Sequence, residues 1–271
     1  MCATCGCDSH SHQHDHDHLH SHSKTIVEVE KDVLYENNML AQRNRGYFDA
    51  KNILALNLVS SPGSGKTSLL ERTLTDLKDQ FTCYVIEGDQ QTSRDADRIH
   101  ATGTKVAQIN TGKGCHLDAH MVLHAIQGMK PAENSILFIE NVGNLVCPAM
   151  FDLGEKERVV IISVTEGDDK PIKYPDMFHT SSICIINKID LLPYVPFSLD
   201  KCKEYARHVN PNLQFIEVSC TSGEGLPALY QWLNRSWDQK PRYTNLLFHR
   251  IQLYEGRLCT VHQDGICCCV L

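Results

Sequence analysis

Two stretches of this chain have the residue types and spacing to bind a purine nucleotide. Residues 61–67 read Ser-Pro-Gly-Ser-Gly-Lys-Thr and follow an apolar run. In such a loop the glycines let backbone N–H groups turn toward phosphates, Lys66 adds a positive charge, and the Thr67 hydroxyl can reach Mg²⁺. Residues 187–190 read Asn-Lys-Ile-Asp after a second apolar run, and an Asp carboxylate there can accept two hydrogen bonds that guanine donates and adenine does not. Together the two stretches predict a GTP site.

The first stretch has the setting of a phosphate-binding loop, although it departs from the full pattern at Ser60, where a glycine is usual. It lies between a predicted strand and a predicted helix, so the helix N-terminus would point at the phosphates. The alternative is an ordinary glycine-rich turn between strand and helix. The predicted nucleotide-binding residues are Pro62, Gly63, Ser64, Gly65, Lys66, Thr67, Ser68, Asn187, Lys188 and Asp190.

Two acidic residues follow or end predicted strands, at the edge of an open α/β sheet where ligands bind. They are Asp89, in Glu-Gly-Asp, and Glu140, after Ile-Leu-Phe-Ile. We expect Thr67, Asp89 and Glu140 to hold Mg²⁺, with Lys66 and Asp89 as the catalytic residues that neutralise phosphate charge and orient water. The alternative for either acidic residue is a helix or turn cap. Residues 219–223 follow the last predicted strand and could brace the guanine.

Cysteine and histidine residues with metal-ligand chemistry lie between the two nucleotide motifs. Cys115 and His116 precede a predicted helix, and Cys147 lies 32 residues after Cys115. Thiolate and imidazole are good ligands for Zn²⁺ and Ni²⁺, and water or a second subunit could supply a fourth ligand. The alternative is that Cys147 is a small buried thiol. The spacing also predicts His116, His120 and His124 on one helical face, where His120 could add a ligand or could simply be solvated.

Residues 1–24 form a low-complexity head that is rich in metal ligands. Cys2, Cys5 and Cys7 are followed by seven histidines that alternate with other residues from position 10 to position 22. Three thiolates so close in sequence need little loop closure to converge on one ion. The head has almost no apolar residues, so we expect it to be disordered without metal. The alternating histidines suggest an exchangeable metal store.

Composition limits the class of protein. The chain has 271 residues, 42% of them hydrophobic, and a net charge of −7, which supports a buried core and gives no reason to expect nucleic-acid binding. It has neither a signal peptide nor an apolar run long enough to span a membrane, so we expect a cytoplasmic protein with no membrane partner. In that reducing compartment the thirteen cysteines are thiols, and clustered ones are candidate metal ligands.

The periodicity predicts how these motifs are positioned. Residues 25–51 should form an amphipathic helix that packs on the next domain, since apolar residues recur there every seven positions. Residues 52–236 alternate near-continuous apolar strands with helices, which predicts an α/β P-loop GTPase domain with a mostly parallel sheet and helices on both faces. Strands are expected at 53–59, 83–87, 106–109, 135–140, 159–164, 183–186 and 214–218, and helices at 66–79, 116–127, 199–208 and 226–234. Residues 237–271 break the pattern and form a C-terminal extension of unknown role.

These motifs in combination resemble the HypB family of hydrogenase nickel-incorporation GTPases. The resemblance covers roughly residues 1–236 and includes the serine at position 60. It rests on Cys-x-x-Cys-Gly-Cys at 2–7, the histidine tract, the phosphate loop, Glu-Gly-Asp-Gln-Gln-Thr at 87–92, Gly-Cys-His-Leu-Asp-Ala at 114–119, and Glu-Asn-Val-Gly-Asn-Leu-Val-Cys-Pro at 140–148.

The resemblance implies a GTPase that helps to insert Ni²⁺ into the [NiFe]-hydrogenase large-subunit precursor, together with the accessory protein HypA. It implies tight Ni²⁺ binding at Cys2, Cys5 and Cys7, and weaker Ni²⁺ or Zn²⁺ binding at Cys115, His116 and Cys147. It also implies a GTP-favoured homodimer with the inner metal site at its interface. No arginine finger is evident, so we expect slow intrinsic turnover.

Two alternative functions remain open. The first is nickel storage or buffering by the histidine tract. The second is a related GTPase that delivers nickel to urease, for which a histidine after the Cys-Pro pair would be favoured, whereas this chain has Ala149.

Overall fold

The structure, a computed structural model, describes residues 26–89, 94–112 and 114–238, with side chains from residue 31 onward, and the backbone of three short strands between 251 and 269. The head and its candidate ligands Cys2, Cys5 and Cys7 lie outside the described residues.

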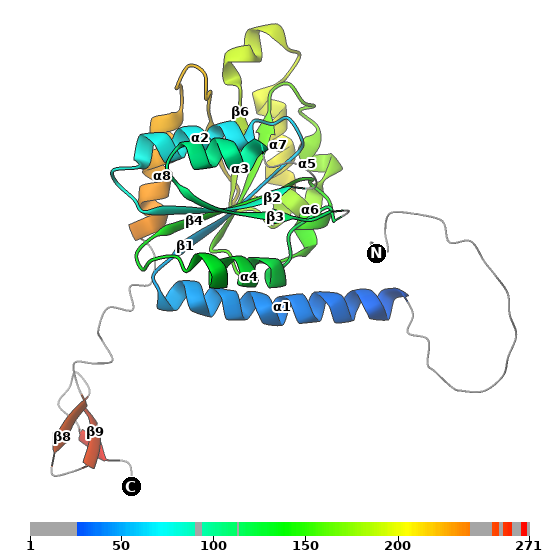
Figure 1. Cartoon of the computed structure of the whole chain (residues 1–271). Coiled ribbons are helices and arrows are strands. Elements are labelled where there is room, and N and C mark those ends of the chain that lie inside the picture. The colour runs from blue at the N-terminus through cyan, green and yellow to red at the C-terminus, as the bar shows by residue number, and fades with distance from the viewer. Residues whose placement is uncertain are drawn as a thin grey trace, which may run out of the picture.

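A seven-stranded, all-parallel sheet forms the centre of the fold (Figure 1). Its strand order is β3-β2-β4-β1-β5-β6-β7, so the strand before the phosphate loop lies in the middle. The predicted fold class is therefore confirmed. The strands are β1 (Leu54–Ser60), β2 (Cys83–Asp89), β3 (Lys105–Asn110), β4 (Ile136–Gly143), β5 (Glu157–Ser163), β6 (Ile183–Asn187) and β7 (Gln214–Glu217).

The helices lie on both sides of this sheet (Figure 1). Those expected from periodicity are present, and the sequence missed α3, α5, α6 and the two 3₁₀ helices, which are too short to show a hydrophobic period. The helices are α1 (Ile26–Ala50), α2 (Lys66–Leu77), α3 (Arg94–Ala101), α4 (Ala119–Met129), α5 (Lys170–Lys173), α6 (Pro175–His179), α7 (Leu199–Val209) and α8 (Leu226–Asp238), and the 3₁₀ helices are η1 (Cys147–Met150) and η2 (Ile189–Tyr194).

Alternating side chains of the central strand pack into apolar clusters on the two opposite faces of the sheet. Leu56 and Leu58 of β1 pack with the apolar faces of α2 and α8, whereas Ala55 packs on the opposite side with residues of α1 and α4. Successive strand residues point to opposite faces, so a strand covered on both faces is apolar along most of its length. All seven residues of β1 are buried.

Helix α1 packs along α4 through polar as well as apolar contacts (Figure 1). Ala41 and Phe48, seven residues apart on the predicted stripe, are buried. The Asn44 amide, also buried, donates to the carbonyl oxygen of Ala119 at 2.9 Å and to that of Leu153 at 3.1 Å. These hydrogen bonds join α1 to the segment that carries the candidate metal ligands.

The described part of the C-terminal extension is a second, antiparallel sheet of order β10-β9-β8, formed by β8 (Ile251–Tyr254), β9 (Arg257–Val261) and β10 (Cys267–Cys269). Within the described residues, every helix is too short or too polar to cross a membrane.

Candidate nucleotide and metal site

The phosphate loop connects β1 to α2, as the sequence predicts. Gly63 has φ 78° and Gly65 has φ 88°, a backbone region that side chains other than glycine rarely adopt. Helix α2 starts at Lys66 directly after Gly65, so its free N–H groups open toward the loop. The Ser64 hydroxyl is buried and has no hydrogen-bond partner among the described residues. The loop therefore presents unpaired donors where phosphate would lie.

Glu140 makes contact with the two reactive side chains of the loop. Its Oε1 accepts hydrogen bonds from the Lys66 ammonium at 2.8 Å and from the Thr67 hydroxyl at 2.6 Å. The Glu140 side chain is fully buried, and its Oε2 has no hydrogen-bond partner among the described residues. A buried carboxylate with one unpaired oxygen is costly unless a cation or donor completes it, so the geometry fits a Mg²⁺ site.

Two further carboxylates lie beside Glu140. Ligand oxygens of Glu87, Asp95 and Glu140 all lie within 4.8 Å of one another. Burial, followed by the nearby Glu140 carboxylate, raises the pKa of Glu87 to about 8. Among the described residues this cluster does not include Asp89, which is the last residue of β2 and is partly buried.

Sequence reasoning named neither Glu87 nor Asp95. Glu87 lies two residues before Asp89, so both point to the same face of the strand, and this alternation is the signal that could have found it. Asp95 lies on α3, a helix that the periodicity did not predict.

The predicted guanine-binding segment lies against the phosphate loop. The Asn187 amide donates to the Ser64 carbonyl oxygen at 2.9 Å, and the Lys188 ammonium donates to the Gly63 carbonyl oxygen at 2.7 Å. Asp190 lies in the first turn of η2. On the other side the Cys220 thiol contacts the Asn187 amide oxygen at 3.5 Å, so residues 219–223 pack behind this segment.

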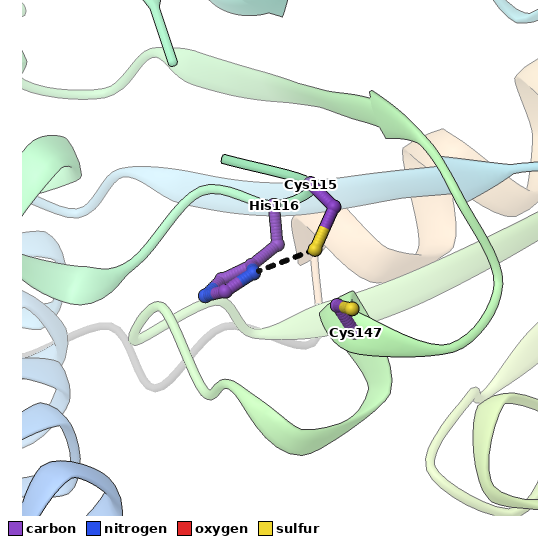
Figure 2. A group of neighbouring side chains, drawn as sticks. All are labelled: Cys115, His116 and Cys147. Carbon is purple, nitrogen blue, oxygen red and sulfur yellow. Dashed lines mark hydrogen bonds between the residues drawn. The ribbon is translucent and has the colours of Figure 1, made fainter. Parts of the chain in front are cut away.

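Cys115, His116 and Cys147 form a second cluster (Figure 2). Their candidate ligand atoms lie within 4.8 Å of one another, and Cys115 Sγ is 3.6 Å from His116 Nδ1. Cys147 is buried at the start of η1, and the other two residues are partly buried. Among the described residues, this is the one group of three or more candidate ligands that contains thiols. The set of two thiolates and an imidazole suits Ni²⁺ or Zn²⁺.

The surroundings of His116 favour the form of the ring that binds a metal. The ring stacks on Phe151 with 3.9 Å between the centroids. Burial lowers the pKa of His116, which keeps the imidazole neutral and leaves a nitrogen lone pair for a ligand. The Asn144 amide donates to the Cys115 carbonyl oxygen at 3.3 Å and so ties the Cys115 loop to the segment before Cys147.

The prediction that His116 shares a helical face with His120 and His124 is wrong. Helix α4 begins at Ala119, because the Asp118 side chain caps it by accepting the Met121 N–H at 2.7 Å. His116 therefore lies in the loop before the helix. His120 and His124 are exposed on α4 and do not belong to the thiol cluster.

The nucleotide and thiol clusters are connected through β4. Glu140 lies within β4, and the same segment continues to Cys147 seven residues later. The neighbouring Asn141, which is buried, accepts the Leu117 N–H at 3.0 Å, one residue beyond His116. A displacement of the end of β4 would therefore shift residues of both clusters.

Comparison with known proteins agrees with this arrangement. The family model "CobW/HypB/UreG, nucleotide-binding domain" matches residues 54–217. Two curated relatives share the name "Hydrogenase maturation factor HypB". The protein from Rhizobium leguminosarum bv. viciae is 59% identical over 78% of this chain and 71% of its own length, and the protein from Escherichia coli K12 is 60% identical over 78% and 72%.

Two solved structures are similar over most of their own length. The hydrogenase maturation factor HypB from Archaeoglobus fulgidus has a TM-score of 0.70 and 38% identity, covering 75% of this chain and 99% of that chain. HypB from Helicobacter pylori in complex with nickel has a TM-score of 0.71 and 39% identity, covering 75% and 95%. With the nucleotide loop and the thiol cluster in place, these matches show that the chain belongs to the HypB family of hydrogenase maturation factors.

Proposed function

We propose that this protein is a GTP-hydrolysing nickel metallochaperone that assists Ni²⁺ insertion into the [NiFe]-hydrogenase large subunit. The observation that carries the proposal is the connection between two sites. Glu140, which contacts the phosphate loop, and Cys147, which belongs to the thiol cluster, lie seven residues apart on one continuous segment. The relatives' names and the nickel complex of the Helicobacter pylori relative support nickel as the cargo.

The contacts of Lys66 suggest how nucleotide would act. In the structure its ammonium is paired with the Glu140 carboxylate at 2.8 Å. The phosphates of GTP would compete for the same ammonium, and Glu140 would then need a new partner. Thr67, Asp89 and Glu140 would hold Mg²⁺, which when bound neutralises phosphate charge. The Oε2 atom of Glu140, which is buried and has no hydrogen-bond partner among the described residues, supports a cation at this position.

Guanine would be selected at the opposite end of the nucleotide. Asp190 would accept hydrogen bonds from the base, while Asn187 and Lys188 keep this segment against the phosphate loop. Asp89 would orient the attacking water. With no arginine finger assigned, turnover would be slow.

Nickel or zinc would bind to Cys115, His116 and Cys147 as cargo. A fourth ligand would come from water or from a second copy of the chain in a GTP-favoured homodimer. HypA and the hydrogenase large-subunit precursor would be the partners in delivery. Coupling must be reciprocal, because GTP can alter nickel affinity only as much as nickel alters GTP affinity.

The test is Ni²⁺ titration of the full chain with and without GTPγS and Mg²⁺, followed by thiolate-to-nickel charge-transfer absorption. The parent carries Cys2, Cys5 and Cys7 replaced by alanine, so that the head thiols do not contribute. We expect a nucleotide-dependent change in Ni²⁺ affinity that disappears in the Cys115→Ala variant.

Cys83→Ala is the matched control. This thiol lies at the opposite end of the sheet, at the start of β2, and burial raises its pKa to about 12. The control should keep the parent response. If GTPγS leaves Ni²⁺ affinity unchanged in the parent, the two sites are uncoupled, and storage by the histidine tract becomes the better explanation.

A further inference from the structure

A buried arginine holds the 3₁₀ helix that begins with Cys147. The side chain of Arg158 on β5 is 7% exposed. Its Nη1 atom donates to the carbonyl oxygen of Ala149 at 3.0 Å, and its Nη2 atom donates to that of Phe151 at 2.8 Å. One guanidinium therefore binds the backbone on both sides of Met150, where η1 ends.

Helix η1 is too short to fix its own position. It has four residues, and the last carbonyl groups of a helix have no partner within the helix. A 3₁₀ helix also has poorer hydrogen-bond geometry than an α-helix. Because Ala149 and Phe151 are both buried, the guanidinium supplies donors that the chain would otherwise lack. Without Arg158 these two buried carbonyl groups would lose a partner, which is costly unless the segment moves.

A buried carboxylate fixes the direction of the guanidinium. Oε1 of Glu155 accepts hydrogen bonds from Nε of Arg158 at 3.1 Å and from Nη2 at 2.9 Å. The Asn57 amide donates to the same oxygen at 3.0 Å, and the Leu153 N–H donates to Oε2 at 2.7 Å. The planar guanidinium can bind a carboxylate and two carbonyl groups in fixed directions, which a lysine ammonium cannot do.

The same polar chain reaches the other segment that carries metal ligands. Asn57 and Asn141 are fully buried, and the Asn141 amide donates to Oδ1 of Asn57 at 3.3 Å. Oδ1 of Asn141 accepts the N–H of Leu117, the residue after His116, at 3.0 Å. A continuous set of buried side chains therefore joins the two segments of the thiol cluster. In order, its members are Arg158, Glu155, Asn57 and Asn141.

The contacts of Phe151 connect this anchoring to the metal ligands. Arg158 binds its carbonyl oxygen, and its ring stacks on the His116 imidazole with 3.9 Å between the centroids. Cys147 lies at the other end of η1, and its candidate ligand atom is within 4.8 Å of those of Cys115 and His116 (Figure 2). A shift of η1 would therefore move one thiol ligand and the support of the imidazole ligand together.

Stability alone is a poor explanation for this buried ion pair. The cost of removing two charges from water offsets their attraction, so apolar residues would stabilise the fold at least as well. Groups that orient metal ligands have a different effect, because their loss typically lowers metal affinity by about 10–100-fold.

We propose that Arg158 is a positioning residue for the thiol cluster, which holds η1 at the distance from Cys115 and His116 that metal binding requires. The inference rests on the proposed function in taking this cluster as a nickel site. It does not depend on nucleotide.

The test is Ni²⁺ binding to the full chain without nucleotide, in the parent with Cys2, Cys5 and Cys7 replaced by alanine. A nickel buffer fixes the free Ni²⁺ concentration, so uptake by the histidine tract does not distort the titration. The thiolate-to-nickel absorption that disappears in Cys115→Ala reports the cluster alone.

Arg158→Met should weaken Ni²⁺ binding at the cluster by about 10–100-fold, because η1 loses its anchor. It should also reduce the charge-transfer absorption at saturating Ni²⁺, because Cys147 no longer reaches the ion. Arg158→Lys keeps a positive charge beside Glu155 but cannot bind both carbonyl groups in the same way. Its affinity should lie between those of the parent and Arg158→Met.

Ile161→Ala is the matched control. Ile161 is also buried on β5, but its side chain packs on the opposite face of the sheet with α2 and α8. This variant should have a lower urea midpoint than the parent, because it leaves a cavity in the core, yet it should bind Ni²⁺ as the parent does.

Parent-like affinity and absorption in Arg158→Met would overturn the proposal. An equal loss of Ni²⁺ binding in Ile161→Ala would also overturn it, because reduced stability would then be a sufficient cause. If urea unfolding shows that Arg158→Met does not fold, Arg158→Lys decides, and parent-like binding in that variant overturns the proposal.

Failure of the proposed function gives a different result. Absence of a GTPγS effect counts against that function and leaves the effect of Arg158→Met unaltered. If Cys115→Ala removes no absorption from the parent, the cluster does not bind Ni²⁺, and both proposals are overturned.

Discussion

Replacing Glu87 with glutamine should remove a pH-dependent penalty from the nucleotide-free protein. Glu87 is 2% exposed and lies directly across from Glu140 in the register of β2 with β4. Burial and that neighbouring carboxylate raise the pKa of Glu87 from its ordinary value of 4.5 to about 8. Because the pKa of Glu87 is raised in the folded state, Glu87 binds its proton more tightly in the folded protein than in the unfolded chain. The resulting contribution to the free energy of unfolding is fully present below pH 4.5 and is lost as pH rises through about 8.

The magnitude follows from the size of the shift. Each pH unit between the two pKa values changes the free energy of unfolding by about 1.4 kcal/mol, so the full interval is worth at most about 5 kcal/mol. With a urea m-value of about 2–3 kcal/mol/M, the midpoint of wild type relative to Glu87→Gln should fall by about 0.5 M per pH unit.

The assay is urea unfolding from pH 5 to pH 8 in EDTA without nucleotide, with wild type and variant compared at each pH so that shared titrations cancel. Glu133→Gln, at an exposed position, is the control and should show no trend relative to wild type. A constant midpoint difference between wild type and Glu87→Gln across this range would refute the raised pKa of Glu87 in the folded protein under these assay conditions.

Two further predictions concern the phosphate loop. Lys66→Ala should reduce GTP hydrolysis to background in a phosphate-release assay, because the phosphates lose their paired cation. Lys78 is the exposed residue after α2, and the control variant Lys78→Ala should hydrolyse GTP normally. Equal rates in the two variants would contradict the assigned role of Lys66. Gly65→Ala should cost about 1–3 kcal/mol in urea unfolding and weaken GTP binding in calorimetry, because its φ is 88° and the new Cβ would lie 2.5 Å from the Asn187 amide nitrogen. Gly103 has a similar φ of 85°, but a Cβ added there would meet open space, so the control variant Gly103→Ala should retain GTP binding. An equal loss of GTP binding in Gly103→Ala would show that backbone strain alone, and not the contact with Asn187, explains the effect of Gly65→Ala.

Much of the fold could be predicted because its signals are local. A strand buried on both faces is apolar along most of its length, and β1 and β6 have that near-continuous pattern. The phosphate loop is equally local, since Gly63 and Gly65 supply the positive φ values that the turn before α2 requires. By contrast, Cys115, His116 and Cys147 were named as candidate ligands from their thiolate and imidazole chemistry, and their grouping in one site was implied by the family resemblance.

The remaining details depend on contacts between segments distant in sequence. A side-chain cap at Asp118 determines that α4 begins after His116, and this separates His116 from His120. Short α3 has too few residues to show a period, yet it brings Asp95 to the carboxylate cluster.

The sequence by itself determined the phosphate loop between a strand and a helix, because that feature depends on residue type at short spacing. It also predicted the guanine-binding motif and the candidate thiol and imidazole ligands from their residue types. Only the tertiary structure decided which carboxylates share the site. Glu87 meets Glu140 because β2 pairs with β4 in a particular register, and Glu140 meets Lys66 because β4 lies beside β1. Strand order and register are set by packing of the whole sheet, and no short stretch of sequence encodes them.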